Sequence, residues 1–400
     1  MTVKQTGTLS ASMTRNVAAS NRRLRVLLFT NSVSMGGMET HVILLARDLD
    51  RQKFEVFAIC PEWTPTDALQ SMLASAADAC AVITPDRRWG TLRQIGETAR
   101  FYRQLREWQI DVLHMHSTTY RGQLWALLAA RLAGVRSIYV TEHLAPEAQL
   151  PPVQRWVRNL FSAAVTGIVC VSQKNYEARR AHVYTPARRT RVVNNGVDLN
   201  DFNPVPEETL AALRQQYAIP QHVPVVGTAV RFEPEKGLSY FIDAMPAIRA
   251  ASPDAHFLMV GDGTLRAELE ARVAQLGLKD CVHFTGFQGD PRPFVSLMDV
   301  FVLPVPVGSM SIGLLEAMAM ERAVVMTFGG EGEAVVHGKS GFCATPRSPE
   351  SIAEYVIQVL HDSGLKQALG HAARQRVATQ FSTQNVTREL SALYLHARTE

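Results

Sequence analysis

Short apolar runs alternate with amphipathic segments along most of the chain, and this alternation limits the fold more strongly than any other feature. Each run is typical of a strand buried on both faces, and the segments between the runs are typical of helices. Strands that alternate with helices form parallel, doubly wound α/β sheets. The predicted strands are residues 25–30, 54–60, 81–84, 111–114, 137–141, 167–171 and 191–193, followed by 223–230, 256–260, 281–284, 300–303 and 323–326.

The 400 residues are too many for one ordinary core and fit two domains. The turn Asn194-Asn195-Gly196 and a proline-containing segment over 201–206 separate the two sets of strands. We therefore predict four parts. They are a disordered tail over 1–23, a Rossmann-like domain over 24–204, a second one over 205–382, and a C-terminal helix over 383–400.

Composition excludes several classes of function. The 41 basic and 37 acidic residues give a net charge of only +4, which is too balanced to indicate a nucleic-acid partner. The five cysteines are scattered, so we expect buried thiols in a reducing compartment without a disulfide framework. No apolar run reaches the ~20 residues of a membrane span, and the first residues lack the apolar centre of a signal peptide. These features predict a cytoplasmic protein.

Three loops at strand ends are candidates for binding an anion. Gly36-Gly37 follows the first strand, where missing Cβ atoms let the backbone approach a ligand. Arg231 and Lys236 lie in one loop, where two cations can clamp a polyanion, although a solvated patch with neighbouring glutamates explains them equally. Residues 303–320 form a strand, loop and helix turn with Glu316 near the helix start, which is either a phosphate site or an ordinary connection.

Histidines follow two of the predicted strands. Because His114 and His116 alternate, we expect at most one to face a ligand and the other to pack or to bond a backbone carbonyl. His143 follows the next strand with no local partner, so it is either structural or functional. Two histidines without a third nearby ligand, and no Asp-x-Asp pair or HExxH, argue against a metal site.

The motifs, taken in order over residues 25–350, resemble the retaining GT-B glycosyltransferases of family four, the group 1 glycosyltransferases. The resemblance implies a GT-B fold, in which two Rossmann-like domains face a central cleft. The shared motifs are Gly36-Gly37-Met38-Glu39, His114-x-His116-Ser117, Glu142-His143, Asn195-Gly196-Val197-Asp198 with Phe202, Arg231 with Lys236-Gly237, Gly261-Asp262-Gly263, 299–304, 315–319, and Gly330-x-x-Glu333 with Gly338-x-x-Gly341.

The resemblance also implies a function. A sugar would pass from a nucleotide-diphosphate donor of UDP, GDP or ADP type to a saccharide, lipid-linked glycan or small-molecule acceptor, as in polysaccharide biosynthesis. Transfer would be retaining and metal-independent, with no cofactor. The first domain would hold the acceptor, the second would bind the nucleotide sugar, and the final helix would cross back to the first. The implied catalytic residues are His143, Arg231 and Lys236; the implied donor-binding residues are Gly36, Gly37, Arg231, Lys236, Gly261, Phe287, Ser311, Ile312, Gly313 and Glu316; His116 would contact the acceptor.

One position departs from the family pattern. The family motif is a glutamate, seven residues and a second glutamate, and counting back from Glu316 places Gly308 at the first position. Three interpretations follow: an altered donor preference, a substitute carboxylate such as Glu331 or Glu39, or a catalytically weak nucleotide-sugar-binding protein. A GT-B-fold sugar-nucleotide epimerase or phosphorylase is a further alternative.

Residues 153–161 mix cations with Trp156, Leu160 and Phe161 at helical spacing. Such a helix either lies on an anionic membrane surface, at the inner face of the membrane, or packs its apolar side on the first domain. The sequence leaves both interpretations open, and it does not indicate the oligomeric state.

Overall fold

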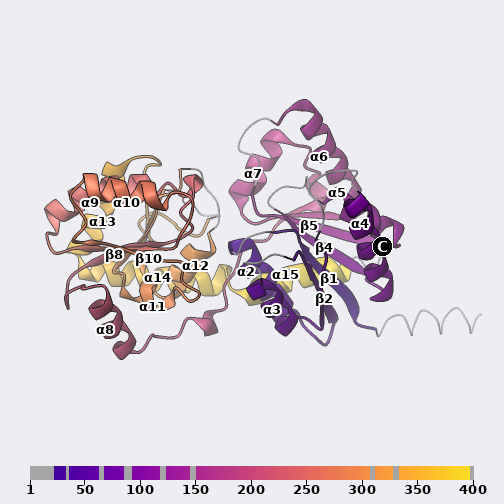
Figure 1. The fold of residues 1–400 in the computed structure, drawn as a ribbon, viewed down its shortest axis with the longest axis horizontal. Helices are drawn as coiled ribbons and strands as arrows, with labels where there is room; N and C mark the ends of the chain where they lie inside the picture. Colours follow the sequence, from indigo (N-terminus) through magenta and orange to yellow (C-terminus); the bar gives the residue numbers. More distant parts are fainter. Residues whose placement is uncertain are drawn as a thin grey trace, which may run out of the picture.

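The computed structural model describes residues 22–32, 36–62, 67–84, 92–117, 123–144, 150–306, 311–327 and 333–396. Two parallel β-sheets, each covered by helices on both faces, form two domains side by side (Figure 1). The predicted fold class, two Rossmann-like doubly wound domains, is confirmed. Most of the predicted tail, together with Gly308 and Glu331, lies outside the described residues.

The first domain contains a seven-stranded sheet of order β3-β2-β1-β4-β5-β6-β7. Side chains from both faces of this sheet form two apolar cores against the surrounding helices. The elements are β1 (Leu24–Thr30), α2 (Gly37–Asp48), β2 (Phe54–Cys60), α3 (Asp67–Ala76), β3 (Ala79–Val82), α4 (Leu92–Glu107), β4 (Val112–Ser117), α5 (Leu124–Leu132), β5 (Ser137–Glu142), α6 (Pro152–Ala164), β6 (Gly167–Cys170), α7 (Gln173–His182), η2 (Ala187–Arg189), β7 (Thr190–Val192) and η3 (Leu199–Asp201).

The second domain contains a six-stranded sheet of order β10-β9-β8-β11-β12-β13. Two further apolar cores cover its faces. The elements are α8 (Glu207–Gln216), β8 (Val225–Ala229), η4 (Pro234–Lys236), α9 (Leu238–Ala251), β9 (His256–Val260), α10 (Arg266–Gln275), β10 (Val282–Gly286), α11 (Arg292–Leu297), β11 (Val300–Leu303), α12 (Ile312–Ala319), β12 (Ala323–Met326), β13 (Phe342–Cys343), α13 (Pro349–His361), α14 (Ser363–Gln380) and α15 (Thr383–His396).

Strand β4 differs from its prediction in a way that affects the site. The apolar run predicted a strand that ends at His114, but β4 continues to Ser117. Its neighbours extend it, because His116 is paired with Thr30 of β1 and Ser117 with Glu142 of β5. Pairing on both sides therefore keeps polar residues in a fully buried strand.

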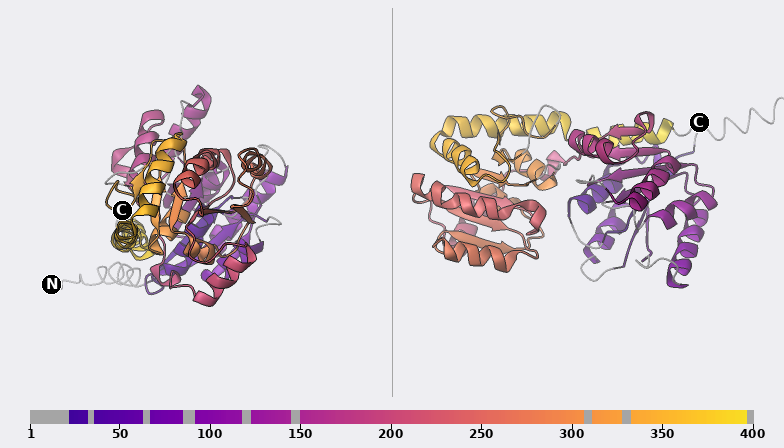
Figure 2. Two further views of the ribbon diagram at one scale, coloured as in Figure 1. Left: turned by 90° about the vertical axis from the view of Figure 1, so that its left-hand side faces the viewer. Right: turned by 90° about the horizontal axis from the view of Figure 1, so that it is seen from above.

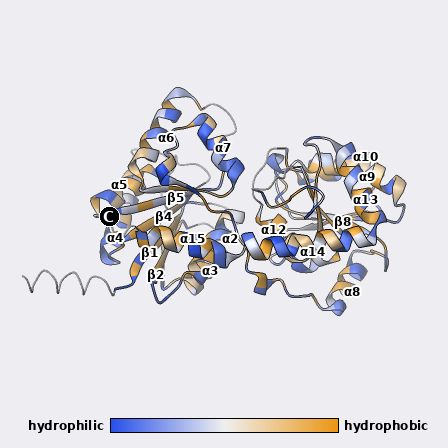
Figure 3. Ribbon diagram, turned by 180° about the vertical axis from the view of Figure 1, so that it is seen from behind, coloured by the Kyte–Doolittle hydropathy of each residue, from blue (hydrophilic) through white to orange (hydrophobic). Residues whose placement is uncertain are grey.

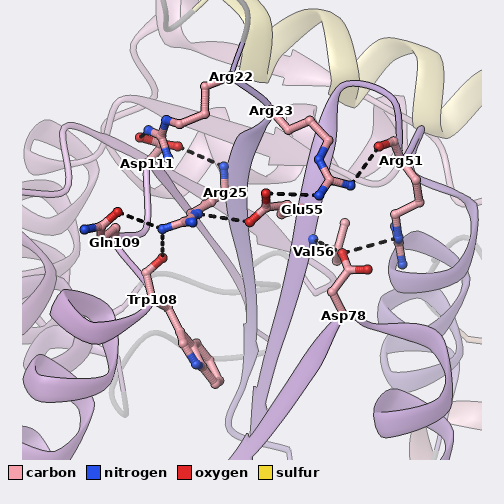
Figure 4. A network of polar contacts seen from close by, with 10 residues as sticks. All are labelled: Arg22, Arg23, Arg25, Arg51, Glu55, Val56, Asp78, Trp108, Gln109 and Asp111. Atoms are coloured by element: carbon pink, nitrogen blue, oxygen red, sulfur yellow. Dashed lines mark hydrogen bonds and ion pairs between the residues drawn. The ribbon is translucent and has the colours of Figure 1, made fainter. Parts of the chain in front are cut away.

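Charged residues join the amino-terminal ends of the first strands (Figure 4). Arg25 on β1 donates from Nε to Glu55 Oε2 of β2 over 3.0 Å, and its backbone amide donates to Asp111 over 2.8 Å. Asp78 accepts from the amide of Val56 over 2.7 Å. The charged side chains at this edge of the sheet hold the strands together. We therefore expect a ligand to bind at the carboxyl-terminal edge.

The chain crosses between the domains twice, and the two crossings lie side by side. The amide of Val197 donates to the carbonyl of Phe381 over 2.9 Å, and the amide of Thr383 donates to Val197 over 3.1 Å. A Cβ at Gly196 would lie 2.7 Å from Val386, so only glycine fits there. After this point α15 packs on α2 and the first sheet (Figure 2).

Candidate active site

The glycine pair of the first domain lies against the second domain. A Cβ built on Gly36 would be 3.7 Å from Nε of Arg231. A Cβ on Gly37 would be 3.6 Å from the side chain of Ile312, which begins α12. Residues predicted from three separate motifs thus meet where the domains touch.

Glu39 sits beneath this contact and is buried in the first turn of α2. A Cβ on Gly36 would lie 3.3 Å from Glu39 Oε2, so the missing side chain leaves room for the carboxyl. Burial raises the pKa of Glu39, whereas a hydrogen bond with Ser32 and the charge of Arg231 act in the opposite direction. A carboxyl group therefore lies close to the cation of the other domain.

The loop after β8 carries two cations with different surroundings. The side chain of Arg231 is half exposed and lies 4.0 Å from the carboxylate of Glu235, which is exposed to a similar degree. Burial lowers the pKa of Lys236, and the negative charge of Glu235 partly offsets this by raising it. A bound anion beside Lys236 would offset this burial cost.

Gly237 fixes the shape of that loop. Its φ of 64° lies in the left-handed region, and a Cβ would press against the carbonyl oxygen of Pro304. Since Pro304 directly follows β11, this contact ties the Lys236 loop to the strand that leads into α12.

The start of α12 and Glu316 form the opposite wall. Ser311 caps the helix without a side-chain hydrogen bond, and the first-turn amides have no acceptor within the helix. A Cβ on Gly313 would lie 2.9 Å from the carbonyl oxygen of Ala229, so this turn packs directly on β8. Amides and a helix N-terminus facing one point suit a negatively charged group.

Glu316 is held close to a second carboxylate. Burial raises its pKa to about 7, Asp290 adds to the rise, and Arg292 opposes it. Arg292 is itself engaged by Asp290 through two bonds of 2.7 and 2.8 Å. Near neutral pH, Glu316 therefore exchanges between a hydrogen-bond acceptor and a protonated donor.

Three histidines gather under the first-domain side of the contact. His116 Nδ1 lies 3.3 Å from His143 Nε2, and the ring of His41 lies 5.2 Å from that of His143 and 5.5 Å from that of His116. All three are buried. Burial lowers the pKa of His41 to about 4 and those of His116 and His143 well below the ordinary value. The cluster is therefore a set of neutral imidazoles at neutral pH, of which His116 and His143 share a hydrogen bond.

One premise about these histidines was wrong, namely that His114 and His116 point in opposite directions. His114 and His116 lie on the same face, with ring centroids 4.4 Å apart, because residues i and i+2 of a strand point the same way. Of the two expected environments, packing or a backbone carbonyl, His114 has the first: it is buried against the ring of Tyr394 of α15 and bonds Tyr394 and, over 2.7 Å, Thr141. His143 has partners that its sequence neighbours do not reveal.

The third histidine removes one of the arguments used against a metal, namely that His116 and His143 have no third ligand nearby. One nitrogen from each of His41, His116 and His143 lies within 4.8 Å of the others. Three neutral imidazoles are a ligand set that Zn²⁺ accepts. Sequence reasoning missed His41, although its position four residues after Gly37 places it on the same helix face.

Two buried arginines support the strand end that carries His143. Glu142 Oε2 accepts from Arg158 of α6 over 2.8 Å and lies 3.6 Å from Nε of Arg179 of α7. The amide of His143 donates to the carbonyl of Ser117 over 2.9 Å. This charged cluster, which the sequence did not predict, fixes the backbone at the histidine.

The remaining predicted donor-binding residues, Gly261 and Phe287, directly follow strands β9 and β10 of the second domain. Gly261 follows β9 with a φ of 134° and bonds the carbonyl of Gly286 through its amide over 3.0 Å. Phe287 follows β10 and is 71% exposed, and no described contact brings it to the other site residues. At a second contact between the domains, the amide of Lys174 on α7 donates to Glu333 of the second domain over 3.1 Å.

Comparisons with known proteins agree with this geometry. Residues 223–362 match the family model of glycosyl transferases group 1, and residues 35–201 match that of glycosyltransferase family 4. The 2-deoxystreptamine glucosyltransferase of Streptomyces kanamyceticus is 32% identical over 299 residues, which cover 69% of this chain and 75% of that protein.

A second relative covers nearly the whole chain. The GDP-mannose-dependent alpha-(1-6)-phosphatidylinositol monomannoside mannosyltransferase of Mycobacterium tuberculosis is 28% identical over 386 residues, covering 92% of this chain and 97% of that protein. Among solved structures, the Anabaena protein HepE in complex with UDP and glucose superposes with a TM-score of 0.80 at 23% identity, covering 93% of this chain and 99% of that one. This likeness shows the GT-B fold. The chain belongs to the group 1 glycosyltransferases.

Proposed function

We propose that this glycosyltransferase moves a sugar from a nucleoside-diphosphate donor with retention of anomeric configuration and without a metal ion. The contact of Gly36 and Gly37 with Arg231 and Ile312 carries the proposal. It brings a turn with no side chains to the point where two cations and a helix N-terminus converge. That combination suits a diphosphate bound between the domains.

The second domain supplies the groups for the donor. Arg231 and Lys236 would neutralise the charge that grows on the diphosphate as the sugar departs. The amides at Ser311 to Gly313 would bind phosphate or sugar oxygens, and Glu316 would accept from the ribose hydroxyls. The relatives named above use GDP-mannose or were crystallised with UDP and glucose, so the donor class is supported while its base stays open.

The first domain supplies neutral groups for the sugar and the acceptor. His143 and His116 cannot act as cations at neutral pH, since burial lowers the pKa of both. They would accept or donate hydrogen bonds to sugar hydroxyls, and the leaving phosphate would take the acceptor proton. Glu39, close to Arg231, is the described carboxyl best placed to substitute for the glutamate that Gly308 replaces.

The acceptor class rests on the relatives alone. One is named for 2-deoxystreptamine and another for phosphatidylinositol monomannoside, a small molecule and a lipid. We therefore propose a saccharide, lipid-linked glycan or small-molecule acceptor.

Incubation with UDP-, GDP- and ADP-sugars and a panel of these acceptors, followed by release of nucleoside diphosphate, tests the donor and the acceptor. NMR of the product should show the anomeric configuration of the donor; inversion would contradict the mechanism. Activity should survive dialysis against EDTA. Loss of activity on chelation, restored by Zn²⁺, would instead assign a metal to His41, His116 and His143.

A weak nucleotide-sugar-binding protein is the second candidate, because Gly308 stands where the family has glutamate. Glu39→Gln separates the two. If Glu39 is the substitute carboxylate, this variant loses transfer but binds donor, and Gly308→Glu adds little. Undetectable transfer in the parent chain together with a gain in Gly308→Glu would favour the binding protein.

A further inference from the structure

One side of α6 presents an apolar stripe to solvent. Val153, Trp156 and Leu160 are exposed to 73%, 65% and 55% of their surface. Their spacing of three and four residues places them on one face of the helix. In Figure 1 this helix lies at the upper outer edge of the first domain, away from the contact between the domains.

The opposite side of α6 is fixed in the domain. Arg158, Phe161 and Ser162 are buried there. Arg158 is bonded to Glu142, and Ser162 accepts a 2.6 Å hydrogen bond from Arg179. Turning the stripe inward would expose these charges, so the interpretation that the apolar side packs on the domain is wrong for Trp156 and Leu160. Only Phe161 of the predicted apolar set packs inside.

The surroundings of the stripe are strongly basic. Residues 150–191 contain seven arginines and Lys174 but a single acidic residue, Glu177. Arg158 and Arg179 are buried beside Glu142, and the other five arginines are exposed. The basic turn η2 adjoins the end of α6, because Arg189 donates to the carbonyl of Ala163 over 3.2 Å. Arg131 of α5 reaches the carbonyl of Ala164 over 2.7 Å. Figure 3 shows hydrophobic and hydrophilic residues side by side on α6 and α7.

We propose that this surface, α6 with η2, binds an anionic lipid bilayer. Tryptophan and leucine insert at the level of the headgroups, and arginines beside them attract anionic lipids. Charge favours this occupant, since an apolar protein partner would need no such excess of arginine. No described helix has the length and apolar character to cross a membrane, so the contact is peripheral.

The position of α6 has a consequence for the reaction. Arg158 on its inner side bonds the residue that precedes His143, so the bilayer contact and the candidate site share one rigid element. A lipid-linked acceptor would therefore enter from this side of the first domain. That consequence rests on the proposed function, whereas the lipid surface rests on exposure and charge.

Flotation of the purified full chain with vesicles tests the surface without any assay of transfer. We expect binding to vesicles of phosphatidylcholine mixed with phosphatidylglycerol and little binding to phosphatidylcholine alone. Replacing Val153, Trp156 and Leu160 together by serine should lower the partition coefficient by roughly tenfold or more. The matched control is Leu276→Ser, an exposed apolar residue of the second domain.

A second pair of variants tests the charge. Arg155→Gln on α6 with Arg188→Gln on η2 should weaken binding to anionic vesicles, whereas Lys279→Gln with Arg347→Gln, exposed cations of the second domain, should not. Absence of vesicle binding, or binding that the serine variant retains, would overturn the proposal. So would a dimer in sedimentation experiments that the serine variant dissociates, because a second copy would then cover the stripe. If vesicles bind but no lipid-linked acceptor reacts, only the assignment of the acceptor fails.

Discussion

The two domains contribute opposite kinds of groups to the candidate site. The first offers buried, neutral histidines, with His116 fully buried and His143 8% exposed. The second offers cations on a loop, with the side chain of Arg231 49% exposed. The first half is rigid before a ligand arrives, because its groups already bond one another. The second half is charged, and in the proposed function a bound diphosphate would supply partners for its cations.

This difference matches the tasks that the two halves would perform. A neutral, preformed surface orients sugar hydroxyls without a penalty for reorganisation. Cations placed where charge develops stabilise a leaving diphosphate. The outer surfaces differ too: the large exposed apolar residues lie mainly on the first domain, where α6 carries Trp156.

The largest effect should come from breaking the buried support of the first half. Glu142→Gln removes the carboxylate that accepts from buried Arg158 and lies beside buried Arg179, which should lower the free energy of unfolding by about 3 kcal/mol. Urea denaturation measures it. The control is Glu97→Gln, whose partner Arg100 is 54% exposed and whose loss should cost less than about 1 kcal/mol. Equal costs for both variants would show that the first half is not rigidly held.

Removing a cation from the second half should affect activity and leave stability unchanged. Arg231→Ala or Lys236→Ala should each lower kcat/KM by at least roughly tenfold, because in the proposed function each removes a charge that would stabilise the departing diphosphate. Steady-state release of nucleoside diphosphate measures the change. Lys279→Ala, an exposed cation of the same domain, should have no effect. Unchanged turnover in both site variants would remove them from the mechanism.

Gly237 tests whether the shape of the cation loop matters beyond its charge. Gly237→Ala should lower donor affinity, because its Cβ would displace the loop from Pro304. Gly277→Ala is a matched control with a similar φ of 70° and no atom within 4 Å of the new Cβ. Backbone strain in the Gly277→Ala variant should lower the free energy of unfolding by only about 1 kcal/mol. Isothermal titration with donor should separate the two, and equal affinities would mean that the loop adjusts freely.

The smallest effect concerns pH. The pKa of Glu316 is raised to about 7, so the group takes up a proton as the pH falls through 7 and loses its capacity to accept from both ribose hydroxyls. Donor affinity should fall several-fold from slightly alkaline to slightly acidic pH. The free energy of unfolding should change with pH in the opposite direction. The raised pKa of Glu316 contributes stability that is fully present below the ordinary carboxyl pKa and is lost as the pH rises through 7. A Glu316→Gln variant with the same affinity profile would contradict this role.

Much of the fold followed from local pattern. Buried parallel strands appear in the sequence as short apolar runs, and the structure has a strand at each of the predicted runs. Strand ends were less predictable, because β4 gains His116 and Ser117 through pairing with its neighbours. Interstrand hydrogen bonds join residues far apart in the chain, so a local sequence pattern does not predict them.

The sequence by itself determined the positions of strands β1 to β12, the glycine pair, and the loop that carries Arg231 and Lys236, because each depends on residues close together in the chain. The short edge strand β13 was not predicted. Only the tertiary structure brought His41 to His116 and His143, joined Glu142 to two arginines, and turned Trp156 outward. Helical spacing shows which residues share a face but not which face is covered. That choice depends on the buried charges opposite, whose partners come from other parts of the chain.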